Sequence, residues 1–103
     1  MKKMYRQGDV LLERVNKIPT GLRLQKASGR IILAHGEVTG HHHSIDADAA
    51  DWWKGDGNEQ YVEVKMPAEV VHQEHGAISI LPGKYKVRRQ REYSPGTIRN
   101  VAD

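Results

Sequence analysis

The chain has 103 residues, of which 38% are hydrophobic, and this length predicts a single domain spanning residues 1–103. It contains no cysteine, which excludes disulfides, thiolate metal sites and a cysteine nucleophile. A formal net charge of +3 permits an anionic partner without requiring one. No apolar run approaches the roughly 18 residues of a membrane span, and the basic start is not a signal peptide, so we expect a cytoplasmic protein.

The first half of the chain alternates short strand-forming segments with turns. We expect strands at 8–15, 22–26 and 30–34, separated by turns at 18–21 and 28–29. Another strand follows Gly40 and carries His41, His42 and His43. Residues 46–59 hold five acidic residues, and we expect a loop there with one helical turn near 47–50. Of Trp52 and Trp53 in this loop, one would fill the edge of the core, or the two would form a lid or a ligand-stacking surface over the histidines.

The second half is also composed of short strands. We expect them at 60–66, 68–72, 77–81 and 84–93. In the first of these, Val62, Val64 and Met66 alternate with polar residues, which predicts that they point inward and that Tyr61 points outward. Seven or eight short strands with frequent turns predict an all-β domain, built as a small barrel or a sandwich.

Five histidines fall into two groups that suggest a metal site, with His41, His42 and His43 in the first and His72 and His75 in the second. Alternate side chains of a strand share a face, so His41 and His43 would project together and His42 would point away. Two imidazoles on one face can hold a transition metal, and His72 could complete the site.

The predicted metal ligands are His41, His43, His72 and His75, with Zn, Fe, Ni or Mn as the metal. Three histidines would leave a position for water, which Glu74 or Glu37 could activate as a general base. The alternative is that both carboxylates are ordinary surface acids. His35 reads as a turn residue rather than a ligand.

The last predicted strand is strongly basic and is the competing site. Its candidate nucleic-acid contacts are Lys84, Lys86, Arg88, Arg89 and Arg91. Lys84, Lys86 and Arg88 would share one face, with the two other arginines opposite, beside Tyr85 and Tyr93. Such a strand could follow a phosphate backbone while the rings stack on bases. The alternative is a solvated strand whose lysines protect a sheet edge.

Three segments, 6–12, 36–43 and 72–93, together about half of the chain, resemble a group of small uncharacterised bacterial and phage proteins. The shared sequences are Arg6-Gln7-Gly8-Asp9-Val10-Leu11-Leu12, the stretch from Gly36 to His43, and the stretch from His72 to Tyr93. This resemblance implies a small protein of that group and carries no activity with it.

The chain also resembles the cupins, small jelly-roll metal proteins. The residues in the order of the first cupin motif are Gly36, His41, His43, Asp48 and Gly55, with aspartate where glutamate is usual and one spacer a residue short. The second motif has proline and glycine followed by a histidine, but no histidine follows Pro82-Gly83 here. This resemblance implies a jelly-roll fold in which His72 or His75 supplies the remaining ligand.

Three functions are compatible with these patterns. The first is a histidine-ligated transition-metal protein, including a minimal metalloenzyme acting on a small anionic ligand. The second is a nucleic-acid-binding module that uses the strand at 84–93. The third is a phage or bacterial interaction protein with structural histidines. The sequence leaves the oligomeric state open, including a homo-oligomer, and predicts no membrane partner.

Overall fold

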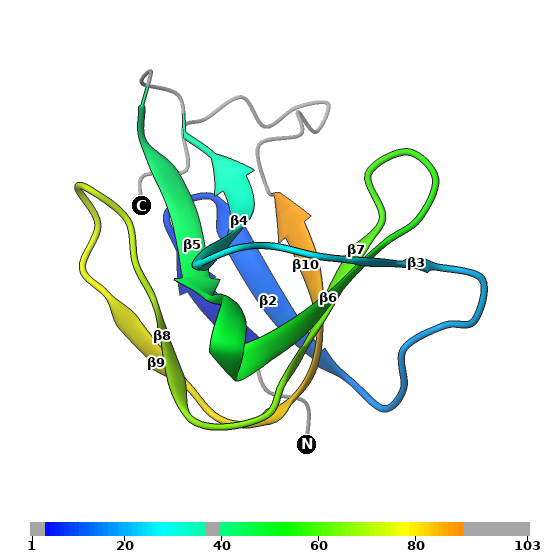
Figure 1. Cartoon of the computed structure of the whole chain (residues 1–103). Coiled ribbons are helices and arrows are strands. Elements are labelled where there is room, and N and C mark those ends of the chain that lie inside the picture. The colour runs from blue at the N-terminus through cyan, green and yellow to red at the C-terminus, as the bar shows by residue number, and fades with distance from the viewer. Residues whose placement is uncertain (1–3, 37–39, 90–103) are drawn as a thin grey trace, which may run out of the picture.

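The computed structural model describes residues 4–36 and 40–89, which form ten strands and one 3-10 helix (Figure 1). The strands are β1 (Met4–Gln7), β2 (Val10–Val15), β3 (Arg23–Gln25), β4 (Arg30–His35), β5 (His42–Asp46), β6 (Ala50–Lys54), β7 (Gln60–Val64), β8 (Ala68–Val70), β9 (Ile78–Ile80) and β10 (Gly83–Arg89). The 3-10 helix η1 (Ala47–Ala49) confirms the predicted helical turn. The described chain is all-β, as predicted, with more strands than the seven or eight expected.

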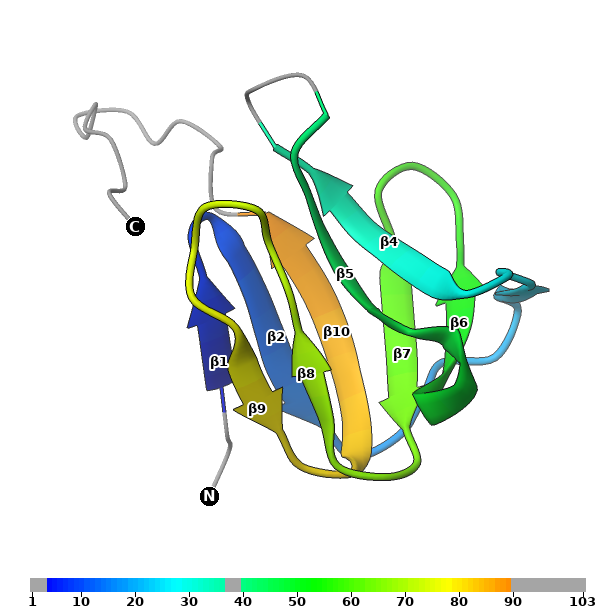
Figure 2. The same ribbon diagram turned by 60° about the vertical axis from the view of Figure 1, so that its left-hand side comes forward.

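The strands form two layers. Six of them make an antiparallel sheet in the order β1-β2-β10-β7-β6-β3. The pairs β4-β5 and β8-β9 are connected edge to edge by a bridge between Ser44 and Val71. These two pairs lie over the six-stranded sheet (Figure 2). The arrangement is therefore a sandwich and not a closed barrel.

The core lies between the two layers. Leu12, Val62 and Tyr85 enter it from the six-stranded sheet, while Ile45 and Val70 enter it from the other layer. Each of these apolar side chains stabilises the fold by roughly 1.5–3 kcal/mol on burial. The Tyr85 hydroxyl donates a hydrogen bond to a main-chain carbonyl at 2.7 Å, so its burial leaves no unpaired polar group. Alternation along the strands thus places the polar positions at the surface and at the ends of the layers.

The strand predicted at 8–15 is present from Val10 to Val15, and its first two residues are instead the turn of a hairpin with β1. β1 ends at Gln7, Gly8 and Asp9 form a two-residue turn, and β2 begins at Val10, which pairs with Gln7. Gly8 has a φ of +59°, which glycine adopts readily. Glycine followed by a polar residue between apolar runs is typical of a hairpin turn, because such turns require positive φ. The correction matters because it brings Gln7 and Asp9 to one end of the sandwich.

Residues 46–59 are not the predicted loop, because β6 occupies the middle of this segment and pairs with both β3 and β7. Trp52 packs against the core edge, as one of the two alternatives predicted, and donates from Nε1 to Gln60 Oε1 at 2.6 Å. Asp51 is the one acid within β6. Asp51 pairs there with Lys65 at 3.3 Å.

The alternation predicted for residues 60–66 is confirmed in part. Val62 and Val64 are buried, as predicted. β7 ends at Val64, however, so Met66 is 49% exposed and does not point into the core. Tyr61 is buried although it lies outside the core cluster, and the ammonium group of Lys86 lies 5.8 Å from its ring centroid.

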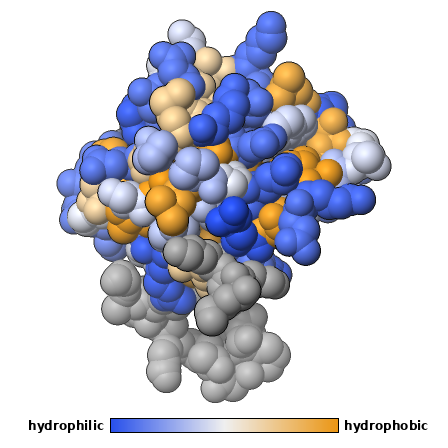
Figure 3. All heavy atoms as spheres, turned by 90° about the horizontal axis from the view of Figure 1, so that it is seen from below, coloured by the Kyte–Doolittle hydropathy of each residue, from blue (hydrophilic) through white to orange (hydrophobic). Residues whose placement is uncertain are grey.

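The described surface is chemically mixed. Its large exposed apolar side chains come from separate elements: Met4, Leu24, Met66, Val71 and Leu81. On the face in Figure 3, hydrophobic atoms are interspersed with hydrophilic ones. Within residues 4–36 and 40–89, no helix has the length and apolarity needed to cross a bilayer.

Candidate metal centre

Four histidines gather at one end of the sandwich, where the segments before β5 and after β8 meet. We call His41, His43, His72 and His75 the histidine cluster. The ring centroids of His43 and His72 are 4.4 Å apart, those of His72 and His75 are 4.6 Å apart, and those of His43 and His75 are 6.0 Å apart. His41 joins the group through His72, with centroids 5.5 Å apart. The structure therefore brings together the two histidine groups that are about 30 residues apart in the sequence.

The strand parity predicted for the first group is correct. His41 and His43 both lie beside His72, whereas the His42 ring lies 6.3 Å from the ring of His35, at the end of β4. His35 is thus the last residue of a strand and not a turn residue. Because alternate side chains of a strand share a face, His41 and His43 point into the histidine cluster and His42 points away from it.

His43 is held in one tautomer by Gln7. The Gln7 side-chain amide donates from Nε2 to the carbonyls of Val70 and Gly76, both at 2.9 Å, so its Oε1 must face His43. His43 Nδ1 therefore donates to Gln7 Oε1 at 2.8 Å. In a neutral ring this leaves the proton off Nε2, whose lone pair can bind a metal or accept a proton. Hydrogen bonds of this kind commonly orient histidine ligands of metals.

Asp9 faces the unprotonated nitrogen of His43. Its Oδ1 lies 3.6 Å from His43 Nε2, and its Oδ2 accepts a hydrogen bond from Arg89 Nη2 at 3.1 Å. Asp9 and Arg89 come from the β1-β2 turn and the end of β10, 80 residues apart. The guanidinium therefore fixes the carboxylate in place at the edge of the histidine cluster.

Burial keeps His43 neutral near pH 7. Loss of solvation lowers its pKa from 6.5 to about 4, and the positive charge that His72 acquires on protonation opposes ionisation further. The carboxylate of Asp9 acts in the opposite direction but does not overcome burial. The pKa of His72 is also lowered, first by desolvation and then by His75 and His41. Neutral imidazole is the form that metals bind.

His72 presents a different nitrogen to its surroundings. Its Nδ1 accepts hydrogen bonds from the backbone amides of Glu74 and His75, at 3.0 and 3.3 Å. In a neutral ring the proton is therefore on Nε2, which is a donor in this arrangement and not a metal ligand. His72 would have to change its tautomer and lose these two bonds to bind a metal through Nε2.

Two glycines leave room for the imidazoles. A Cβ added to Gly8 would lie 2.7 Å from His75 Nε2, and one added to Gly36 would lie 3.2 Å from His72 Nε2. His75 Nε2 thus packs directly against the β1-β2 turn that carries Asp9. The absence of side chains at these two positions allows the rings to approach the backbone.

The two predicted general bases are Glu74 and Glu37. Glu74 Oε2 lies 3.9 Å from His41 Nδ1, but its side chain is 66% exposed. It is therefore a surface acid at the rim of the histidine cluster. Glu37 lies outside the described residues.

The cluster has the spacing of a metal site without being closed into one. Imidazoles that share a tetrahedral zinc at about 2.0–2.1 Å have centroids roughly 5 Å apart, and the observed separations are 4.4–6.0 Å. Over the described ranges, no group of three or more histidine, aspartate or glutamate side chains is already arranged to hold a metal ion.

The basic strand β10 alternates as predicted. Lys84, Lys86 and Arg88 lie on the outer face of the sheet, where Arg88 pairs with Glu13 at 3.2 Å. Tyr85 is fully buried, so its ring cannot stack on a base. Arg89 faces inward to Asp9, and the remaining predicted residues, Arg91 and Tyr93, lie outside the described part of the chain.

The sequence patterns did not reveal Gln7, Asp9 or Arg89 as members of the site. Gln7 lies just before the strand predicted at 8–15 and Asp9 lies within it, so the hairpin between them is absent from the prediction. The available signal was the Gly8-Asp9 pair, which indicates a turn and therefore polar side chains at a sheet end. Alternation along the strand places Arg89 on the inner face, but it does not predict that Asp9, 80 residues away in the sequence, is its partner.

Comparison with known proteins identifies the family without an activity. No curated protein and no solved structure matches the chain. One family model matches residues 6–90, which include Gln7, Asp9, Arg89 and the whole histidine cluster. The chain therefore belongs to the family described as Domain of unknown function (DUF8820).

Proposed function

We propose that this protein binds one divalent transition metal at the histidine cluster, through His43, His75 and Asp9. The observation that carries the proposal is the Gln7–His43 hydrogen bond, which directs an unprotonated Nε2 of a buried imidazole toward a carboxylate. Two histidines and one carboxylate suit Zn, Mn, Ni or Fe, and this ligand set is typical of non-haem iron(II) sites.

The distances support a shared ligand set. Two donors at about 2.1 Å from one metal lie roughly 3.0–3.5 Å apart in octahedral or tetrahedral geometry. His43 Nε2 and Asp9 Oδ1 are 3.6 Å apart, so a small inward movement would satisfy both bonds. His75 Nε2 packs against Gly8, next in sequence to Asp9, and the ring centroid of His75 lies 6.0 Å from that of His43.

The remaining members of the cluster have different roles in this proposal. His72 keeps its two backbone hydrogen bonds at Nδ1 and offers Nε2–H as a donor to a water or anion rather than a lone pair to the metal. His41 lies beside His72 and is available as a further ligand. Three protein ligands leave positions for water or substrate, which is the pattern of catalytic rather than structural metal sites. A small metalloenzyme that activates a bound water is therefore the enzymatic form of this proposal.

The test is metal stoichiometry with matched variants. Untagged protein should retain about one equivalent of metal by elemental analysis, and cobalt(II) added to metal-free protein should give ligand-field absorption. His43→Ala, His75→Ala and Asp9→Asn should each reduce the stoichiometry or affinity. His35→Ala is the control, since it removes an exposed histidine outside the cluster. Equal cobalt binding by all four variants and the unmodified chain would refute the site.

The competing explanation is that the histidines are structural. His43 is buried with its Nδ1 paired, which an ordinary core histidine would also show. In that case His43→Ala would lower stability equally with and without added metal. A metal-dependent difference in stability separates the two explanations, because only a bound metal adds free energy to the folded state.

A further inference from the structure

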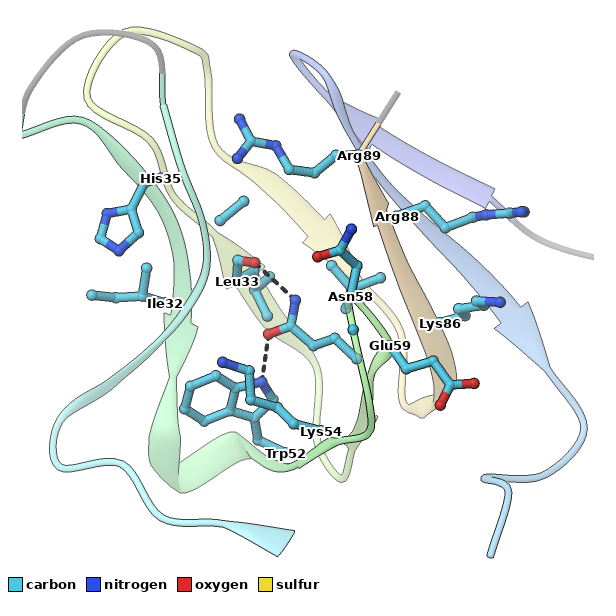
Figure 4. A pocket seen from close by; sticks show the side chains of 14 residues that line it. Ile32, Leu33, His35, Trp52, Lys54, Asn58, Glu59, Lys86, Arg88 and Arg89 are labelled. Atoms are coloured by element: carbon cyan, nitrogen blue, oxygen red, sulfur yellow. Dashed lines mark hydrogen bonds between the residues drawn. The ribbon is translucent and has the colours of Figure 1, made fainter. Parts of the chain in front are cut away.

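A broad groove runs between β4 and the strands β7 and β10, with a volume of about 1080 Å³ (Figure 4). Its walls include Ile32 and Leu33 from β4, Trp52 from β6, Asn58 from the segment after β6, and Arg89 from β10. Ligand sites commonly combine apolar walls with a few polar groups of fixed orientation. This groove has that composition.

Hydrogen bonds fix the floor of the groove before any ligand binds. Gln60 donates from Nε2 to the Leu33 carbonyl at 2.9 Å and accepts from Trp52 Nε1 at 2.6 Å. Both bonds are visible in Figure 4. The first bond connects the two layers of the sandwich, and the second holds the indole in one orientation, so a ligand would meet a surface that is already ordered.

The charged residues that line the groove are the acid Glu59 and four cations, Lys54, Lys86, Arg88 and Arg89. In Figure 4 the Arg89 side chain reaches over the groove, whereas Lys86 and Arg88 extend to the other side of β10. Arg89 uses Nη2 for Asp9, and its Nε is buried without a hydrogen-bond partner among the described residues. At the other end, the Lys54 ammonium lies 5.3 Å from the Trp52 ring centroid.

Arg89 also connects the groove to the histidine cluster. One side of its guanidinium holds Asp9, whose other oxygen faces His43, and the rest of the side chain lines the groove. The Arg89 side chain is 27% exposed, so the guanidinium N–H groups that do not bond Asp9 can donate to an acceptor in the groove. An anionic acceptor would gain most, because the donor is charged.

We infer that the groove binds an organic anion, a carboxylate or a phosphate ester with an apolar body, whose charged end pairs with Arg89. The apolar body lies along Ile32 and Trp52, and Lys54 adds long-range attraction. This position sets the charged end of the ligand beside the histidine cluster. A role for this anion as substrate or co-ligand of the metal rests on the proposed function. Its binding in the groove does not.

The experiment uses metal-free protein and the two tryptophan indole N–H signals in a ¹H–¹⁵N spectrum, assigned with Trp53→Phe. Trp53 is the internal control, because it points to the opposite face of β6 from Trp52. Benzoate and phenyl phosphate should shift the Trp52 signal saturably and leave the Trp53 signal in place. Comparison of the two affinities identifies which anion the groove prefers. Benzyl alcohol, with the same ring and no charge, should bind at least about tenfold more weakly.

Matched variants test the role of the cation. Arg89→Gln should weaken benzoate or phenyl phosphate binding about tenfold. Lys84→Gln removes one charge from the far end of the same strand and should change nothing. If Arg89→Gln fails to fold, Lys54→Gln tests the role of positive charge instead. Lys54 is exposed, so this variant should keep its structure and bind the anions more weakly.

Three results would overturn the inference: equal binding of benzyl alcohol and the anions, equal shifts of both tryptophan signals, or unchanged affinity in both Arg89→Gln and Lys54→Gln. A single-stranded oligonucleotide that binds through Lys84, Lys86 and Arg88 without shifting Trp52 would place the anion site on the outer face instead. Anion binding by metal-free protein with no metal affinity would refute only the proposed function. Metal binding without anion binding would refute only this inference.

Discussion

Gln7 and His43 are joined by a 2.8 Å hydrogen bond that determines which imidazole nitrogen faces the candidate metal centre. Gln7 can orient His43 because its own amide is anchored to two carbonyls, those of Val70 and Gly76. One side chain at the end of β1 therefore connects three segments: the start of β5, the end of β8 and the loop that follows β8. Every prediction below depends on this end of the sandwich.

Replacement of Gln7 by leucine should damage both stability and metal affinity. The change leaves the buried Nδ1–H of His43 and two carbonyls without partners, which should cost roughly 2–4 kcal/mol in the free energy of unfolding. Loss of an orienting hydrogen bond typically lowers metal affinity by about 10–100-fold. Urea unfolding and cobalt titration measure the two effects. Gln25→Leu is the control, because the Gln25 amide bonds only a nearby exposed carbonyl. A Gln7→Leu protein as stable as the Gln25→Leu protein would contradict the assigned network.

The strand parity of the first histidine group predicts unequal effects of neighbouring substitutions. A metal at a hundredfold excess over its Kd should add about 2.7 kcal/mol to the stability of the folded chain. For a domain of this size the melting temperature should rise by roughly ten degrees or more. His43→Ala should abolish the rise, whereas His42→Ala should retain most of it, because His42 points toward His35. If His42→Ala removes the metal effect as completely as His43→Ala, His42 is a ligand and the parity argument fails.

The low pKa of His43 predicts acid sensitivity of the metal-free protein. The folded pKa of about 4 lies below the ordinary value of 6.5, so the unfolded chain binds the proton more tightly. Stability is therefore fully present above about pH 6.5 and is lost as the pH falls toward 4. From pH 8 to pH 5 the contribution of His43 should fall by about 2 kcal/mol. The lowered pKa of His72 acts in the same direction.

Urea unfolding at pH 8 and pH 5 measures this difference. His43→Gln should remove most of it, because glutamine does not titrate. His35→Ala should preserve it, since that exposed side chain lies outside the cluster. An unchanged pH dependence in His43→Gln would mean that other groups determine the acid sensitivity.

Two glycine substitutions separate backbone strain from damage to the site. Gly8 and Gly21 both have positive φ, at +59° and +90°. Alanine at Gly21 would meet no atom within 4 Å, so Gly21→Ala should cost only about 1–2 kcal/mol of backbone strain. Alanine at Gly8 would also press on His75 Nε2. Gly8→Ala should therefore be less stable than Gly21→Ala and should lose metal affinity, as measured by calorimetric melting and cobalt titration. Equal metal affinity in the two variants would remove His75 from the ligand set.

The sequence by itself determined the properties that depend on local periodicity. Alternation of apolar residues gave the all-β class, the burial of Val62 and Val64, and the separation of His43 from His42. These follow from the period of a strand, which fixes the direction of each side chain relative to its neighbours. The acidic composition of residues 46–59 predicts a loop, but β6 forms there because it pairs with β3 and β7.

Only the tertiary structure decided which polar groups meet. Gln7 reaches His43 across 36 residues, and Asp9 reaches Arg89 across 80. The register of strands that are distant in sequence determines such pairs, and one chain carries no local signal of that register. The same long-range contacts decide the tautomers, because Nδ1 of His43 meets an acceptor while Nδ1 of His72 meets two amide donors. The sequence could therefore supply the imidazoles, but the packing of the two layers determines which of them can offer a lone pair to a metal.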